Sequence, residues 1–158
     1  MKRRYFLGAG LACAFAGVTR AAPVGARPGP RDLCPVCGML VSKYPHWVSA
    51  MVWNDGALFF DGAKDLFKAW LDPARYLRGR RIAEVRSVEV TDFYSLERID
   101  ARRAFFVIGS DVLGPMGHEL VVFSSEADAQ AFFTEHRATR ILRFAEVNRD
   151  VLRLLDAR

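Results

Sequence analysis

Residues 47–71 decide the fold, and they read WVSAMVWNDGALFFDGAKDLFKAWL. The alternation over residues 47–53 predicts a β-strand, because side chains of a strand point to opposite faces in turn. Asn54-Asp55-Gly56 is typical of a tight turn. Residues 57–60 then predict a second strand, which closes a β-hairpin with the first.

A helix follows this hairpin. Asp61 is a favourable N-cap. The apolar residues after it recur at the spacing that forms one face of an amphipathic helix: Ala63, Leu66, Phe67, Trp70 and Leu71. Asp72-Pro73 ends the helix, since proline cannot continue it. Residues 82–94 are rich in Val and Thr and predict one or two further strands.

The second half of the chain repeats this order. Its expected elements are a strand at 104–108, a connection at 109–117, a strand at 119–123, a helix capped by Ser124 or Ser125 with the face Ala129, Phe132, Phe133 and His136, a strand at 140–144 and a closing helix at 148–155. Because hairpin, helix and strand occur twice, we expect an α+β fold of two small, internally duplicated modules.

The chain divides into four expected segments. Residues 1–22 are an export signal, residues 23–33 a flexible Pro/Gly-rich tether, residues 34–98 the first module and residues 99–158 the second. Duplicated modules often face each other across a pseudo-twofold axis. Such an arrangement would bring the start of the first module close to the connection at 109–117 of the second.

The first 22 residues predict the cellular compartment. A basic start precedes an apolar run from Tyr5 to Val18, and Arg3-Arg4-Tyr5-Phe6-Leu7 matches the twin-arginine pattern of bacterial export signals. We therefore expect a periplasmic protein released by cleavage. The alternative is a membrane-anchored lipoprotein that carries a lipid on Cys13, although Gly10 stands where a lipoprotein signal has an aliphatic residue.

The charge distribution argues against a nucleic-acid-binding protein. The net charge is +5, but Lys2, Arg3, Arg4 and Arg20 all lie in the export signal, and the basic and acidic residues after them almost balance. The sequence contains no basic stripe with interleaved aromatic residues. It also contains no Ser/His/Asp arrangement and no paired-carboxylate motif, so we expect a binding protein and not an enzyme.

Cys34-Pro-Val-Cys37-Gly-Met39 is the motif richest in sulfur. Thiolate and thioether ligands select soft metals, above all Cu(I), with Zn(II) and Fe–S clusters as competitors. Three other interpretations of Cys34 and Cys37 are a thiol–disulfide redox pair, a structural zinc site and a structural disulfide. A redox pair would need a helix after its first cysteine, and residues 38–45 show no helical stripe. A zinc site would need more ligands at suitable spacing.

A second sulfur lies in the loop Gly114-Pro115-Met116-Gly117-His118. A methionine in a loop bracketed by Gly and Pro gains little from packing, so Met116 is a candidate ligand, and His118 is a further donor in the same loop. Met39 is equally compatible with ligation and with packing. Cu(I) is therefore the expected metal, with Cys34, Cys37, Met39, Met116 and His118 as candidate ligands. Met51, within a strand, is expected in the core.

The ordered set of motifs resembles the nitrous-oxide-reductase accessory protein (NosL) family. The set comprises Cys-x-x-Cys-Gly-Met at residues 34–39, Phe-Phe-Asp before a helix, Phe-Phe-Val-Ile-Gly-Ser at 105–110 and Gly-Pro-Met-Gly-His-Glu at 114–119. The resemblance implies an exported Cu(I) metallochaperone that supplies copper for the copper–sulfide cluster of nitrous oxide reductase. The implied partners are an ABC-type maturation complex and the apo-enzyme. A periplasmic thiol–disulfide oxidoreductase and a heavy-metal scavenger or sensor remain as alternatives.

Overall fold

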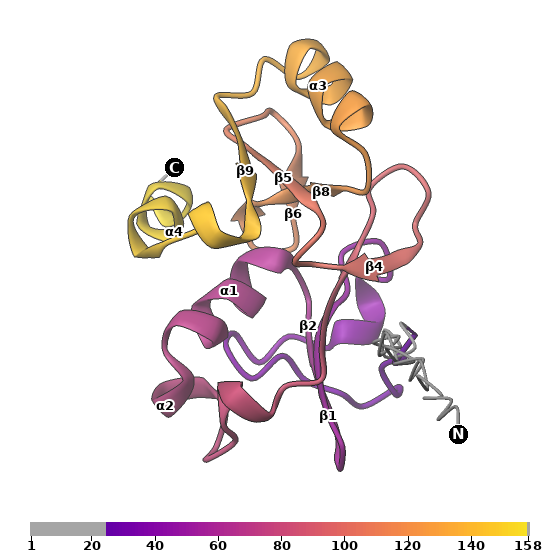
Figure 1. The fold of residues 1–158 in the computed structure, drawn as a ribbon, viewed down its shortest axis with the longest axis vertical. Coiled ribbons are helices and arrows are strands. Elements are labelled where there is room, and N and C mark those ends of the chain that lie inside the picture. Colours follow the sequence, from indigo (N-terminus) through magenta and orange to yellow (C-terminus); the bar gives the residue numbers. More distant parts are fainter. Residues whose placement is uncertain (1–24, 158) are drawn as a thin grey trace, which may run out of the picture.

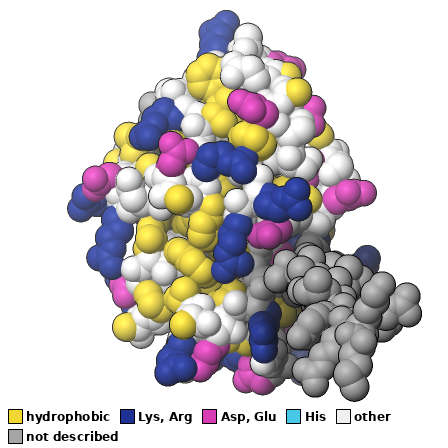
Figure 2. All heavy atoms as spheres, in the orientation of Figure 1, with side chains coloured by type: hydrophobic (Ala, Val, Ile, Leu, Met, Phe, Trp, Pro, Cys, Tyr) yellow, Lys and Arg dark blue, Asp and Glu magenta, His cyan; other side chains and the backbone are white. Residues whose placement is uncertain are grey.

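The computed structural model describes residues 25–157, so the expected export signal lies outside the described residues. Figure 1 shows two helix-bearing sheets stacked along the long axis of the molecule, with α4 beside the junction between them. None of the helices in the described range is both long and apolar enough to cross a membrane. On the face drawn in Figure 2, basic, acidic and apolar side chains are interspersed.

The first sheet contains four antiparallel strands in the order β2-β1-β3-β4. They are β1 (Ser49–Trp53), β2 (Gly56–Phe60), β3 (Ser87–Thr91) and β4 (Arg98–Asp100). The hairpin predicted between residues 47 and 60 is confirmed, with Trp53 paired to Gly56 at the turn. Helix α1 (Ala63–Leu71) follows it, and then come α2 (Pro73–Tyr76) and a 3-10 turn (Ile82–Glu84). Another 3-10 turn, Val41–Lys43, precedes β1.

The second sheet contains three antiparallel strands in the order β8-β5-β9. They are β5 (Phe105–Ile108), β8 (Val121–Phe123) and β9 (Arg140–Arg143), and α3 (Glu126–Glu135) connects β8 to β9. A small hairpin of β6 (Leu113–Gly114) and β7 (Gly117–His118) carries the methionine loop between β5 and β8. The chain continues through a 3-10 turn (Phe144–Glu146) to α4 (Arg149–Asp156).

The two sheets share one connectivity. In each, a hairpin leads into a helix, and the strand after that helix pairs with the first strand of the hairpin: β3 with β1, and β9 with β5. The α+β class and the hairpin–helix–strand order are confirmed. The origin of this repetition in an internal duplication stays a prediction. The expected boundary between residues 98 and 99 falls inside β4, which pairs with the first sheet.

The two halves are joined by a common apolar core. Its buried side chains come from both sheets and from the last helix, including Phe67 of α1, Phe106 of β5 and Leu152 of α4. The rings of Phe67 and Phe106 meet edge to face at 5.1 Å. Met51 is fully buried in this core, as expected. A second cluster, which includes Phe123 and Phe132, lies under α3.

The starts of the two helices differ from each other. Ser125 caps α3 as predicted, since its Oγ accepts a hydrogen bond from the Asp128 amide. The prediction for α1 was wrong: the N-cap is Gly62, which has no side chain, and Asp61 lies one residue earlier. The carboxylate of Asp61 contacts Cys37 instead. The local sequence favoured Asp61 as the N-cap of α1. In the structure its side chain contacts the cysteine loop, which lies far away in the sequence, and does not cap the helix.

Candidate metal centre

The Cys34–Met39 motif forms a tight turn. The Cys34 amide donates to the Met39 carbonyl at 2.8 Å, and the Gly38 amide donates to the Cys34 carbonyl at 2.9 Å. Gly38 has φ of +78°, a left-handed conformation that glycine adopts without steric cost. An isolated antiparallel bridge between Leu33 and Leu40 closes the base of the turn. The turn therefore holds both thiols in one short, well-defined loop.

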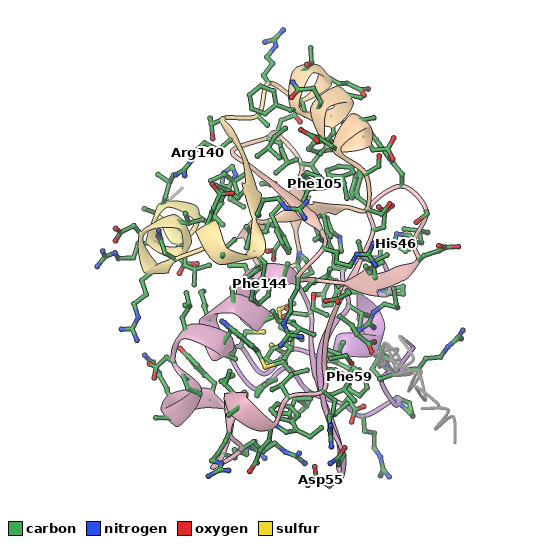
Figure 3. All side chains as sticks on the ribbon, viewed as in Figure 1. His46, Asp55, Phe59, Phe105, Arg140 and Phe144 are labelled. Carbon is green, nitrogen blue, oxygen red and sulfur yellow. The ribbon has the colours of Figure 1, made fainter. Side chains whose placement is uncertain are left out.

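Two aspartates from the start of α1 face these thiols. Cys34 Sγ lies 3.4 Å from Asp65 Oδ2, and Cys37 Sγ lies 3.3 Å from Asp61 Oδ2. One donor atom from each of the four side chains lies within 4.8 Å of every other. Sulfur atoms gather beside α1 in the middle of the molecule in Figure 3. The arrangement is compact enough to surround a single metal ion.

The cluster is buried, and two of its carboxylate oxygens have no hydrogen-bond partner. Cys34 is 2% exposed, and Asp61 and Asp65 are each 1% exposed. The second oxygen of each carboxylate, Asp61 Oδ1 and Asp65 Oδ1, is buried and has no hydrogen-bond partner. Asp65 Oδ1 has a longer ion-pair contact, 3.7 Å, with Lys68 Nζ. Because buried polar atoms are nearly always hydrogen-bonded, both oxygens are candidates for contact with an ion.

The protonation of the cluster follows from the same burial. Burial raises the pKa of the Cys34 thiol far above its usual range, and the negative charge of Asp65 adds to this effect. Burial likewise raises the pKa of Cys37 to about 12. The pKa of Asp65 is also raised, first by burial and then by the charge of Asp61. Without metal the thiols are therefore protonated at neutral pH, and a bound cation must displace their protons.

The methionine loop reaches the same place from the second half of the chain. Cys37, Asp65 and Met116 all line one cavity of about 580 Å³. Charged groups of α1 and α4, among them Lys68 and Asp156, line the rest of it. Met116 is 43% exposed, so its thioether is accessible from solvent. The two sulfur-bearing loops lie more than 70 residues apart in sequence, yet they share one cavity. We expected these loops to come together if the two modules face each other.

The other candidate ligands lie differently. Met39 is half-buried, and its carbonyl closes the cysteine turn. His118 is half-buried on β7, where it pairs with Leu113, and it does not belong to the Cys/Asp cluster. Ligation by Met39 and His118 stays a prediction. His136 is the C-cap of α3, where it stacks on Phe132 at 4.2 Å and pairs with Asp111.

Sequence reasoning missed Asp61 and Asp65. The usable signal was a pair of acidic residues four positions apart around the expected helix start, although Asp61 precedes the N-cap Gly62 and lies outside the helix. It was not decisive, because acidic residues are common in the first turn of a helix for electrostatic reasons alone.

The profile of the NosL family matches residues 26–152. The chain belongs to the NosL family. The copper-binding lipoprotein NosL of Stutzerimonas stutzeri is 34% identical over 125 residues, which are 77% of this chain and 64% of that protein. The chain therefore spans somewhat less than two thirds of the length of this curated relative.

Two solved NosL structures resemble the chain. The crystal structure of the copper chaperone NosL from Shewanella denitrificans has 30% sequence identity and a TM-score of 0.67, and the match covers 82% of this chain and 99% of that one. The solution structure of apo-NosL from Achromobacter cycloclastes has 26% identity, a TM-score of 0.42, and coverage of 66% and 87%. The family profile, the curated relative and the crystal structure confirm the NosL resemblance drawn from the sequence motifs.

Proposed function

We propose that this protein is an exported Cu(I) metallochaperone in which Cys34, Cys37 and Met116 supply the sulfur ligands. One observation carries the proposal: Cys37 and Met116, from opposite halves of the chain, line the same cavity. Thiolates and thioethers together select Cu(I) over harder ions. A thioether also resists the disulfide formation to which thiols outside the cytoplasm are liable.

The architecture suits delivery as well as binding. A carrier must release its ion by exchange with the ligands of the receiver, and a closed four-ligand shell would slow that exchange. Cys34 is buried, whereas Cys37 is half-buried and Met116 is exposed at the cavity. An incoming ligand would reach the ion from the Met116 side, while Cys34 held it from below.

Membership of the NosL family supports a client and a compartment for this protein. Two relatives are described as a copper-binding lipoprotein and a copper chaperone. We infer that the copper of this protein goes to the copper–sulfide cluster of nitrous oxide reductase, in a handover that involves an ABC-type maturation complex. The protein would act in the periplasm, either free or tethered by a lipid.

The geometry disfavours a thiol–disulfide oxidoreductase. The attacking group in such an enzyme is a thiolate, which requires a lowered thiol pKa and access to solvent. Here Cys34 is buried, the carboxylates of Asp61 and Asp65 face the thiols, and the pKa of both thiols is raised. A second copper-handling role, scavenging without a client, would use the same site and differs only in its partners.

Titration of the reduced protein with Cu(I) against a competing chelator, followed by X-ray absorption, tests the proposal. The wild type should bind one Cu(I) tightly with sulfur as the main donor. Met116→Ala should weaken binding on the order of 10- to 100-fold, the scale of changes around a metal site, and should remove one sulfur from the spectrum. Met51→Leu is the control, because it conserves volume in the core and should cost less than ~1.5 kcal/mol of stability. Unchanged affinity in a folded Met116→Ala protein would remove Met116 from the site.

A further inference from the structure

Lys64 is an almost fully buried lysine on the first turn of α1, next to Asp65 in the sequence. Its side chain is 2% exposed, and its ammonium lies 3.4 Å from the Asp156 carboxylate at the end of α4. Removing an ammonium from water costs several kcal/mol, and an apolar side chain of similar size often stabilises a fold at least as well as a buried ion pair. Stability alone therefore does not explain a lysine at this position.

The ammonium of Lys64 also contacts the methionine loop. Nζ donates a hydrogen bond of 2.9 Å to the carbonyl oxygen of Met116. That loop is the turn of the β6–β7 hairpin, whose strands have two residues each. With its side chain 43% exposed, Met116 has little packing to hold it in place. A charge-assisted bond to its backbone is thus a strong restraint on an otherwise small and exposed loop.

Lys64 is itself fixed from below. The buried carboxyl group of Glu119 accepts, through Oε1, hydrogen bonds from the Lys64 amide at 2.5 Å and from the Leu120 amide at 2.8 Å. It takes the place of the side-chain cap that Gly62 cannot provide. A Cβ at Gly62 would collide with the Glu119 carboxylate, and a Cβ at Gly114 would collide with the Glu119 side chain. Glu119 therefore fills the space between the start of α1 and strand β6.

We propose that Lys64 is a positioning residue for Met116: it fixes the methionine loop relative to the thiols through the first turn of α1. The inference rests on the proposed function, in which Met116 is a ligand. Two adjacent residues in the first turn of α1 then contact the two sulfur-bearing loops of the site. Asp65 faces Cys34, and Lys64 holds the backbone of Met116. The helix sets the distance between the sulfur groups.

Lys64→Met tests this positioning in the metal-free protein. The substitution keeps an unbranched side chain, one atom shorter than that of lysine, and removes the donor. With 13C-labelled methionine methyl groups and amide relaxation measured by NMR, we expect the Met116–Gly117 segment to become more mobile while the Cys34–Met39 turn keeps its order. Lys68→Met is the control for the loss of an ammonium at this cavity, because Lys68 pairs with Asp156 at 2.9 Å and with Asp65 at 3.7 Å but has no bond to Met116. Equal order of the Met116 loop in wild type and Lys64→Met would overturn the proposal.

A double-mutant cycle then tests the link to copper. Lys64→Leu, which removes the donor without adding a thioether to the site, should lower Cu(I) affinity on the order of 10-fold in the wild-type background and leave it unchanged in the Met116→Ala background, because Lys64 acts only through Met116. An equal loss in both backgrounds would show a general structural effect and overturn the proposal. If a variant does not fold, Lys64→Gln replaces it, since the glutamine side chain is one bond shorter than that of lysine and carries no ammonium.

The two measurements separate the two proposals. A wild-type protein that binds no Cu(I) would refute the chaperone function, while the relaxation data on the metal-free protein would still decide whether Lys64 orders the loop. Tight Cu(I) binding with an unchanged loop in Lys64→Met would leave the chaperone in place and refute the role of Lys64.

Discussion

The first turns of α1 and α3 occupy the same place in the two sheets, yet only one of them is locally satisfied. Each helix follows a strand that ends in a fully buried phenylalanine, Phe60 or Phe123. In α3, Ser125 caps the helix and exchanges hydrogen bonds with Asp128. In α1, glycine stands at the N-cap, and the aspartate at the position of Asp128 is Asp65, which is buried against Cys34.

This contrast shows how a repeated structural unit becomes a metal site. The exposed first turn of α3 is stabilised by its own side chains, in the way that N-cap residues normally stabilise a helix. The start of α1 has no capping side chain of its own, and two carboxyl groups are buried beside it. Glu119, from a distant segment, accepts the hydrogen bond of the Lys64 amide instead. The aspartates that would have stabilised the helix are thereby free to face the thiols.

The largest effect should come from the thiols themselves. Replacing Cys34 and Cys37 with Ser should abolish tight Cu(I) binding, with a loss well beyond the ~100-fold that second-shell changes produce. The metal-free protein should melt within a few degrees of wild type under reducing conditions, as calorimetry would measure. A loss of many degrees would instead show that the pair stabilises the fold, and the site would lose its main support.

The next effect compares the two equivalent aspartates. Asp65→Asn should weaken Cu(I) binding by about 10-fold or more, since it removes a negative charge beside the thiols. Relative to wild type, the metal-free variant should gain stability as the pH rises, because burial raises the pKa of Asp65 and the folded state therefore disfavours its charged form. Asp128→Asn, at the same helical position in α3, should leave binding unchanged and cost at most about 0.5 kcal/mol. Equal effects of the two variants on copper would remove Asp65 from the site.

A smaller effect concerns how each helix start is capped. Burial raises the pKa of Glu119 to about 8. The folded state therefore holds a proton that the unfolded state releases above its ordinary pKa of 4.5, and this stabilising contribution is lost as the pH rises through 8. Relative to wild type, Glu119→Gln should gain more than about 1 kcal/mol in free energy of unfolding between pH 5 and pH 8. Urea titration at several pH values measures it.

Ser125→Ala is the counterpart in α3. The substitution should lower the free energy of unfolding by about 1 kcal/mol, the usual effect of losing an N-cap side chain. This loss should be the same at every pH. A pH-independent difference for Glu119→Gln as well would mean that its carboxyl group titrates normally, and the contrast between the two helix starts would then be steric alone.

Much of the fold was readable from local patterns. The alternation of residues 47–53, the Asn54-Asp55-Gly56 turn and the apolar stripe of α1 depend on neighbours within a few residues, and the structure confirms each of them. Strand β4 and the β6–β7 hairpin were not predicted, because strands of two or three residues carry almost no periodic signal. Asp61 was misassigned as a cap because its contact with Cys37 spans 24 residues.

The sequence by itself determined most of the elements, the sulfur-bearing motifs and the family, since each is written in short contiguous stretches. Only the tertiary structure decided that Cys37 and Met116 share a cavity, that Asp61 and Asp65 complete the cluster, and that Lys64 and Glu119 connect its two halves. The physical reason is burial. A lysine or a glutamate is ordinarily a surface residue, and its removal from water becomes visible only when distant segments have packed around it.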